Sequence, residues 1–167
     1  MSDFKIIAPA VLGSQDIASN STTQNHDLGF CVQAEDDAST AYGVGEFIYA
    51  KGLAATVVGS VVTISEDDFS TALAVANGVG KTAFAMSACV AGEYGWYQTS
   101  GKAVAKSLAS NADNVAQYLT ATAGSLDDAV VAGDRIHRAI SGSAVDTPSS
   151  GLIEMEIDRP STDNIAD

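Results

Sequence analysis

The amino-acid sequence predicts an all-β domain, a compact β-barrel or sandwich of about nine to eleven short strands with an irregular N-terminal arm. The first observation behind this prediction is that apolar residues recur at every second position through much of the chain. The second is that glycines separate these runs at a spacing of roughly ten residues. The third is that 46% of the 167 residues are hydrophobic. That is enough for one domain with its own core.

Composition divides the chain into three segments. Residues 1–27 are predicted to form the N-terminal arm, because the stretch 19–25 is polar and contains no large apolar side chain. Residues 28–159 carry the organised, β-rich domain, and residues 160–167 form a polar C-terminal tail.

The first predicted strands surround a glycine-serine turn. Residues 46–51 place two aromatic side chains on one face of a strand. Residues 55–58 and 61–64 then form a predicted β-hairpin, with Gly59 and Ser60 at its turn.

A second hairpin is predicted between residues 71–76 and 82–90, which both alternate in the manner of strands. The dipeptide Asn77-Gly78 between them tolerates the positive φ that tight hairpin turns require. Both faces of residues 82–90 are nearly apolar, as expected of a strand that is covered on both sides.

Three later runs also alternate, at residues 94–98, 135–140 and 152–157, and Gly101 is expected to end the first of them. The region 102–122 is ambiguous. Its apolar residues fit a helical stripe, and its polar residues offer a helix start near Ser110, so the alternative fold is α+β with a helix within residues 102–122.

The charge balance excludes two classes of partner. The formal net charge is −13, so the surface repels phosphate backbones and anionic membranes. We therefore expect no nucleic-acid binding and no membrane binding. The sequence has no secretory leader pattern and no run of 18 apolar residues, which predicts synthesis in the cytoplasm.

No motif predicts an enzyme, a cofactor or a metal site. Cys31 and Cys89 form no CxxC pair, and both are expected to be small buried hydrophobes. The run Gly78 to Thr82 resembles the end of a phosphate-binding loop, but the required earlier glycine is replaced by Val75.

The charged residues are interpreted as structural. The acidic groups at residues 35–37, 66–68 and 127–128 are expected at solvated turns, with a weak cation site as the alternative. His137 is expected at a surface or interface, because no nucleophile motif lies near it. The arginines of the C-terminal third are expected to pair with acids; they are Arg135, Arg138 and Arg159.

Aromatic and apolar side chains provide the candidate interface. Tyr94, Trp96 and Tyr97 lie on one predicted strand, and such residues often anchor protein interfaces, although core packing is the competing interpretation. Phe4 and Ile6, in the arm, complete the set of candidate interface residues.

Three runs, in this order, make residues 28–157 resemble the small decoration (cement) proteins of tailed-bacteriophage heads. They are residues 28–30 leading to 45–51, residues 94–98 with the following Gly101, and residues 118–128. None of these runs is catalytic.

The resemblance implies a β-rich, non-enzymatic protein, commonly a homotrimer, that binds the outer surface of the icosahedral shell. Its partner would be the major capsid protein, whose capsomer contacts it would reinforce. The resemblance also implies strands rather than a helix in residues 102–122. An alternative is a phage tail or adhesion module in which Trp96 and Tyr97 meet a host glycan or receptor, and a small enzyme with a dispersed site is the third possibility.

Overall fold

The computed structural model describes residues 3–8, 14–53 and 55–165, and within these ranges the chain is all-β, without a helix. The predicted fold class is therefore confirmed. The strands of the described residues are β1 (Phe4–Ala8), β2 (Asn20–Ser21), β3 (Cys31–Asp36), β4 (Val44–Gly52), β5 (Val61–Ile64), β6 (Ser70–Leu73), β7 (Gly80–Ala85), β8 (Tyr94–Lys106), β9 (Ala116–Leu119), β10 (Leu126–Asp127), β11 (Arg135–Ser141) and β12 (Leu152–Thr162).

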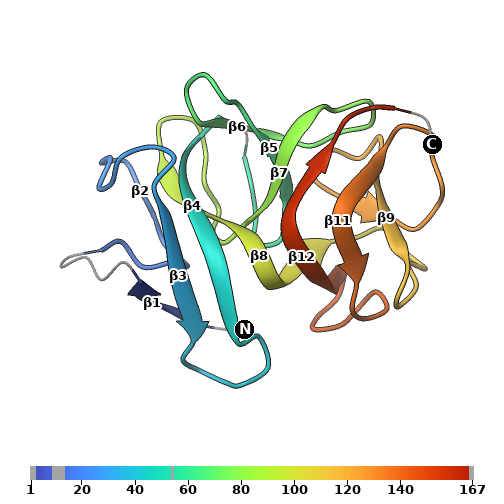
Figure 1. The fold of residues 1–167 in the computed structure, drawn as a ribbon, viewed down its shortest axis with the longest axis horizontal. Helices are drawn as coiled ribbons and strands as arrows, with labels where there is room; N and C mark the ends of the chain where they lie inside the picture. Colours follow the sequence, from blue (N-terminus) through green and yellow to red (C-terminus); the bar gives the residue numbers. More distant parts are fainter. Residues whose placement is uncertain (1–2, 9–13, 54, 166–167) are drawn as a thin grey trace.

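These strands form one mixed sheet that closes on itself in the middle of the molecule. The order along the sheet is β1-β3-β4-β6-β5-β7-β8-β12-β11-β9-β10, and β4 also pairs with β8, which closes β4, β6, β5, β7 and β8 into a ring. All pairings between these strands are antiparallel except β4–β6. In Figure 1, β1, β3 and β4 lie on one side of the molecule and β9, β11 and β12 on the other, with β5, β7 and β8 between them.

Alternation along the strands sorts side chains between buried and exposed faces. In β3, Val32 and Ala34 are buried while Cys31 and Gln33 are exposed. In the central strands both faces are covered, because the ring has its own small cluster of buried side chains as well as neighbours outside it. This explains why residues 82–85 are apolar at nearly every position.

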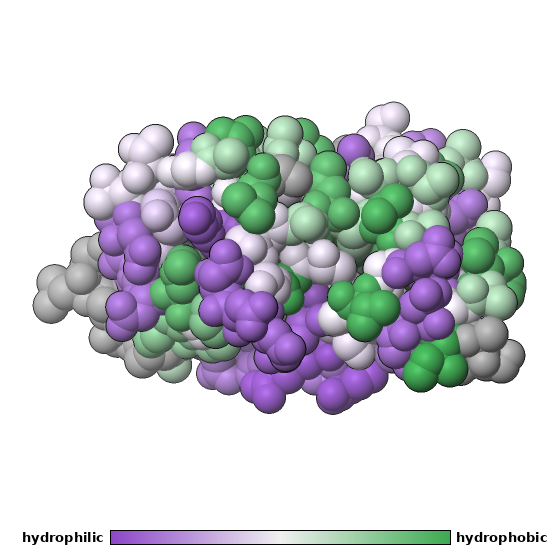
Figure 2. Space-filling view, turned by 90° about the horizontal axis from the view of Figure 1, so that it is seen from above, coloured by the Kyte–Doolittle hydropathy of each residue, from purple (hydrophilic) through white to green (hydrophobic). Residues whose placement is uncertain are grey.

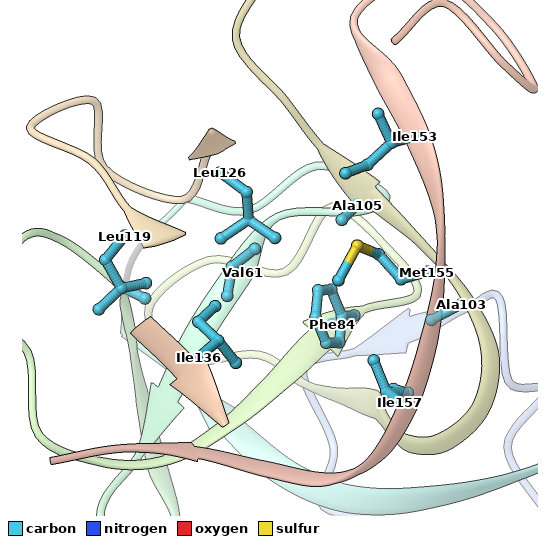
Figure 3. Packing of buried hydrophobic residues seen from close by; sticks show 11 residues of the cluster. Val61, Phe84, Ala103, Ala105, Leu119, Leu126, Ile136, Ile153, Met155 and Ile157 are labelled. Atoms are coloured by element: carbon cyan, nitrogen blue, oxygen red, sulfur yellow. The ribbon is translucent and has the colours of Figure 1, made fainter. Parts of the chain in front are cut away.

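Two larger clusters flank the ring. The aliphatic cluster lies towards the C-terminal strands and is shown in Figure 3. Its members are Val61, Ala74, Phe84, Ala103, Ala105, Leu119, Leu126, Ile136, Ile153, Met155 and Ile157. The aromatic cluster lies towards the N-terminal strands, and its buried members are Phe4, Ile17, Val32, Ala34, Phe47, Tyr49 and Trp96.

The predicted hairpins are wrong in their strand pairing. Residues 55–58 contribute to no strand; Val57 instead donates its N–H to the Ser60 hydroxyl in a turn. The turn at Asn77 exists, with φ of 65°, but the strands it connects, β6 and β7, are not neighbours. β5 lies between them and pairs with both. Alternation indicates which face a residue takes, but not which strand lies beside it.

The helix alternative for residues 102–122 is also wrong. Residues 102–106 continue β8, which Gly101 bends, with φ of +95°, rather than ends. Ala103 and Ala105 point into the aliphatic cluster, as strand alternation requires. Ser110, the expected helix start, has a positive φ of 72° that is incompatible with a helix.

The two terminal segments are more tightly integrated than an arm and a tail. In the described part of residues 1–27, β1 pairs with β3 and β2 pairs with β8, while Phe4 and Ile17 are buried. At the other end, β12 continues to Thr162, which is buried and donates its hydroxyl hydrogen to the Gly78 carbonyl. Polar composition marked these segments as irregular, but Phe4 and Ile17 each pack into the aromatic cluster and join the N-terminal segment to the core.

Candidate binding groove

The predicted interface residues lie mostly inside the molecule. Trp96 is 0% exposed and Tyr97 is 1% exposed, and they point from opposite faces of β8 into the aromatic cluster and the ring. Phe4 is buried against Phe47, with ring centroids 4.9 Å apart. In the folded monomer these three side chains form core contacts, which favours the competing core-packing interpretation for Trp96 and Tyr97; Phe4 also lines the groove described below.

The other two candidates are half-buried. Ile6 and Tyr94 pack on the edge of the aromatic cluster and keep part of their surface in solvent. Tyr94 stacks on Tyr49 at a centroid distance of 6.3 Å. The structure thus brings Phe4, Ile6, Tyr94 and Trp96 together around one cluster, and it separates Tyr97 from them on the other face of β8.

A polar centre that the sequence did not reveal holds Trp96 in place. The Trp96 indole N–H donates to the Gln15 carbonyl oxygen at 2.9 Å, and the Tyr49 hydroxyl donates to the Gln15 side-chain oxygen at 2.9 Å. The Gln15 backbone N–H donates to His26 Nε2 at 3.2 Å. Burial lowers the pKa of His26, against the raising effect of Asp27. His26 is therefore neutral at neutral pH and accepts this hydrogen bond.

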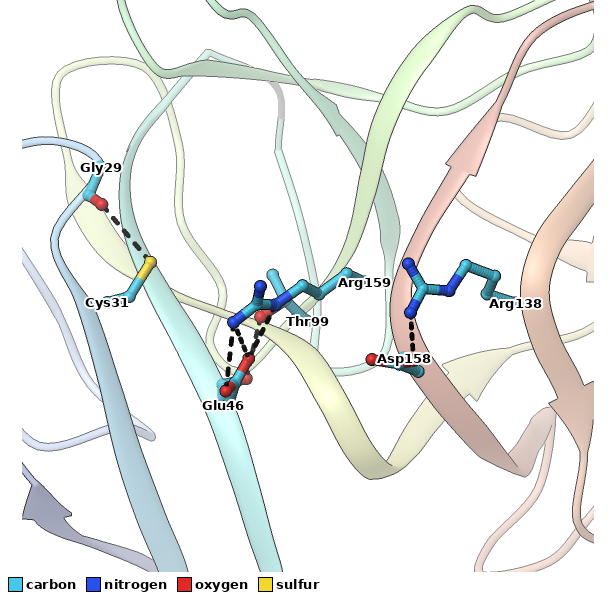
Figure 4. Close-up of polar contacts among 7 residues, drawn as sticks. All are labelled: Gly29, Cys31, Glu46, Thr99, Arg138, Asp158 and Arg159. Carbon is cyan, nitrogen blue, oxygen red and sulfur yellow. Dashed lines mark hydrogen bonds and ion pairs between the residues drawn. The ribbon is translucent and has the colours of Figure 1, made fainter.

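The charged residues have structural partners. Arg159 lies 3.0 Å from Glu46, and Arg138 pairs with Asp158 on the same face of the molecule (Figure 4). The prediction that the arginines of the C-terminal third pair with acids is confirmed for Arg138 and Arg159. Cys31, in the same view, is exposed on β3, contrary to the expectation that both cysteines are buried.

Of the three acidic groups expected at solvated turns, residues 66–68 lie at a turn, but Glu35 and Asp36 end β3, where Asp36 is buried, and Asp127 lies in β10. The Asp68 carboxylate accepts hydrogen bonds from the Ser70 hydroxyl and N–H, which lower the pKa of Asp68 at the β5–β6 turn. Lys81 and Thr82 lie within β7 and not at the start of a helix. His137 lies 3.4 Å from the Asp163 carboxylate. Among the described residues, no group of three or more His, Cys, Asp or Glu side chains is placed to hold a metal ion.

One concave, apolar feature stands apart from these contacts, and we call it the groove. It has a volume of about 440 Å³, and most of the side chains along it are apolar. The residues that line it are Phe4, Ala18, Tyr42, Val57, Val58, Ala85, Met86, Gln98, Val104, Pro148, Ser149 and Leu152.

Strand geometry explains how distant segments form the groove. Gln98 and Val104 lie on β8 before and after its bend at Gly101, and Leu152 lies at the start of β12, which pairs with β8. The Gln98 amide donates to two backbone carbonyls of β8 itself, at 3.1 and 2.9 Å. Phe4 and Met86 extend the groove to the aromatic cluster. The groove is therefore a continuation of that core towards solvent.

A charged group borders the groove beside Tyr42. Lys102 Nζ lies 2.8 Å from Glu154 and 5.0 Å from the centre of the Tyr42 ring. Burial, followed by the negative charges of Glu154 and Asp36, raises the pKa of Tyr42 to about 12. Tyr42 is thus a neutral phenol across the physiological range, and it presents an apolar ring to the groove.

Comparisons of the chain with protein-family models, curated proteins and solved structures find no match. No helix in the described part of the chain is long and apolar enough to cross a membrane. The resemblance to phage decoration proteins therefore stays a prediction.

Proposed function

We propose that this chain is a non-enzymatic structural protein of a bacteriophage virion. It binds the outer surface of the icosahedral head as an oligomer, in the simplest case a homotrimer, and stabilises contacts between capsomers of the major capsid protein. In this proposal it is made in the cytoplasm of the host bacterium and resides on the exterior of the virion.

The observation that carries the proposal is the chemistry of the groove. Among the described residues that line it, Tyr42 is the one titratable side chain, and its high pKa keeps it neutral. Acid–base or nucleophilic catalysis needs titratable or nucleophilic groups in contact with each other and with a substrate. The described lining residues offer the hydroxyls of Tyr42 and Ser149 but no Asp, Glu, His, Lys or Cys side chain. Such a concave, mainly apolar surface suits the binding of a partner's side chains.

Surface composition supports the same proposal. The formal net charge of −13 keeps a free subunit soluble, while Leu53 and Val79 expose about half or more of their surface beside one shallow depression. Figure 2 shows hydrophobic residues in separate patches over the upper part of the view and a hydrophilic band along its lower edge. Several modest contact patches on one rigid domain suit a protein that docks at repeated positions, because an oligomer gains avidity from weak individual contacts.

The alternative, a tail or adhesion module, has lost its supporting observation. It required Trp96 and Tyr97 to present their rings to a glycan or receptor, and both rings are buried. No other described feature favours it.

Co-sedimentation with undecorated phage heads tests the proposal. We expect saturable binding of the purified protein, and a mass by light scattering of three times the 17.0 kDa of one chain. Binding that saturates at a fixed number of copies per head would support decoration. A protein that stays in the supernatant at all concentrations would overturn it, whatever its oligomeric state.

A further inference from the structure

We propose that protonation of His26 loosens residues 14–26 from the aromatic cluster, so that this segment covers the cluster at neutral pH and opens more often in mild acid. Opening uncovers the indole of Trp96, which the segment holds by a hydrogen bond. The proposal holds whether or not the chain decorates phage heads, because every contact involved lies within one chain.

The hydrogen bond between Gln15 and His26 fixes the protonation state of the imidazole. A backbone N–H can only donate, so His26 Nε2, 3.2 Å from the Gln15 nitrogen, presents a lone pair and carries no proton. The neutral ring therefore carries its proton on Nδ1. Protonation of Nε2 sets two donors against each other and leaves the Gln15 N–H without its acceptor.

Gln15 is the residue through which this segment bonds to the aromatic cluster, and it is buried. Its backbone carbonyl accepts the Trp96 indole N–H at 2.9 Å, and its side-chain N–H donates to the Tyr94 carbonyl at 3.1 Å. Its side-chain oxygen accepts from the Tyr49 hydroxyl and the Asn25 amide, both at 2.9 Å. Because these bonds share one residue, a displacement of the Gln15 backbone weakens them together.

The other attachments of the segment are an aliphatic side chain and a short strand. Ile17 is fully buried in the aromatic cluster, and β2 pairs with β8 over two residues. Two carboxylates lie on these elements: Asp16 is exposed, and Glu93 accepts a hydrogen bond from the Asn20 amide at 2.6 Å. Neither contributes to the pKa of His26. A segment attached by so short a strand opens more readily than the paired strands of the core.

The surroundings of His26 give the direction of the pH dependence. Asp27 is the charged group that acts on the ring, and it favours the imidazolium. From the other elements the ring meets Phe30, Tyr49 and Trp96, at centroid distances of 5.8, 5.0 and 5.2 Å. Burial raises the pKa of the Tyr49 phenol, which therefore stays neutral. Burial outweighs Asp27 and lowers the pKa of His26, so the open segment takes up the proton more readily than the closed one.

Hydrogen exchange of the Trp96 indole N–H tests the proposal. Trp96 is the one tryptophan of the chain, so a single resolved NMR signal reports whether its bond to Gln15 is made. Between about pH 7.5 and 5.5, its protection, corrected for the intrinsic exchange rate, should fall at least about three-fold. Backbone amides of residues 14–26 should follow it. Amides of β5 and β7, which contain no histidine, should keep their protection.

The two histidines of the chain supply matched variants. His26→Gln keeps a neutral hydrogen-bonding side chain that does not titrate, so it should abolish the pH dependence of the Trp96 exchange. His137→Gln, in β11, should leave it unchanged. NMR titration of the His26 ring in the wild-type protein needs no variant. Its midpoint should lie below the usual value of 6.5 and coincide with the loss of protection at Trp96.

Four outcomes would overturn the proposal. The first is a His26 midpoint at or above 6.5, which would mean that the surrounding rings and Asp27 stabilise the imidazolium in the closed state. The second is an unchanged protection of the Trp96 indole N–H. The third is an equal loss of protection in β5 and β7, which would mean global unfolding. The fourth is a pH dependence that persists in His26→Gln.

Discussion

The aliphatic and aromatic clusters flank the same ring of strands, but different forces hold them together. The aliphatic cluster packs apolar side chains of β5, β7, β8, β9, β10, β11 and β12, with Phe84 as its largest member. The aromatic cluster surrounds a buried amide, Gln15, whose side chain and backbone bond to Trp96, Tyr49, Asn25 and Tyr94.

The two clusters also differ in which segments of the chain they hold together. The aliphatic cluster joins strands that already pair with their neighbours. The hydrogen bonds of Gln15 instead span up to 81 residues of sequence. They attach the described residues 14–26, whose strand pairing with β8 is limited to the two-residue strand β2. A segment with few backbone hydrogen bonds to its neighbours is attached to the core mainly by side-chain hydrogen bonds.

The largest loss of unfolding free energy is expected from a substitution in the aliphatic cluster. Phe84→Ala removes a fully buried ring and leaves a cavity, so it should lower the free energy of unfolding by about 3–5 kcal/mol. Urea denaturation measures this, and Val130→Ala, at an exposed position, is the control. A loss below about 1 kcal/mol would mean that the cluster collapses around the cavity.

Gln15→Ala is expected to cause a smaller loss of stability that is confined to the N-terminal segment. This change leaves the buried Tyr49 hydroxyl and the Asn25 amide without their acceptor, at a cost of about 1–3 kcal/mol. Amide hydrogen exchange should become faster in residues 14–26 and stay unchanged in β11 and β12. Uniform acceleration across the chain would contradict the idea that Gln15 fixes one segment.

Tyr49→Phe measures how much of the stability lost in Gln15→Ala comes from the hydrogen bond of the Tyr49 hydroxyl. The ring stays in the cluster, while the hydroxyl loses its bonds to the Gln15 side chain and to the Asn25 N–H. We expect a loss of about 1 kcal/mol, and Gln15→Ala with Tyr49→Phe should cost less than the sum of the two single changes. An additive double-mutant cycle would show that the two groups are not coupled.

The smallest effect is the pH dependence of the aromatic cluster. Burial lowers the pKa of His26 below its usual value of 6.5, so the unfolded chain takes up its proton first as pH falls. The contribution of His26 to stability is full above pH 6.5 and declines below it, towards the lowered pKa of the folded state. Unfolding free energies measured from about pH 7.5 to 5.5 should fall. His26→Gln should remove this trend and His137→Gln should keep it; the reverse would assign the trend to His137.

Part of this architecture could be predicted from the sequence. Alternation in residues 46–51, 94–98 and 152–157 indicated strands, and each lies within a strand of the structure. A turn at Asn77-Gly78 was also predicted, and Asn77 has a positive φ, although the strands on either side of this turn do not pair. The groove could not be predicted, because its walls come from Phe4, Met86, Val104 and Leu152, and no spacing along the chain links these positions.

The sequence by itself determined the all-β class, the acidic surface and the positions of most strands, because period-two alternation, net charge and turn residues are local properties. Only the tertiary structure decided that β5 lies between β6 and β7, that Trp96 and Tyr97 are core residues, and that Gln15 anchors the N-terminal segment. Alternation shows that β8 has two faces, but whether a face is buried depends on which strands pack against it. That depends on contacts between residues far apart in the chain.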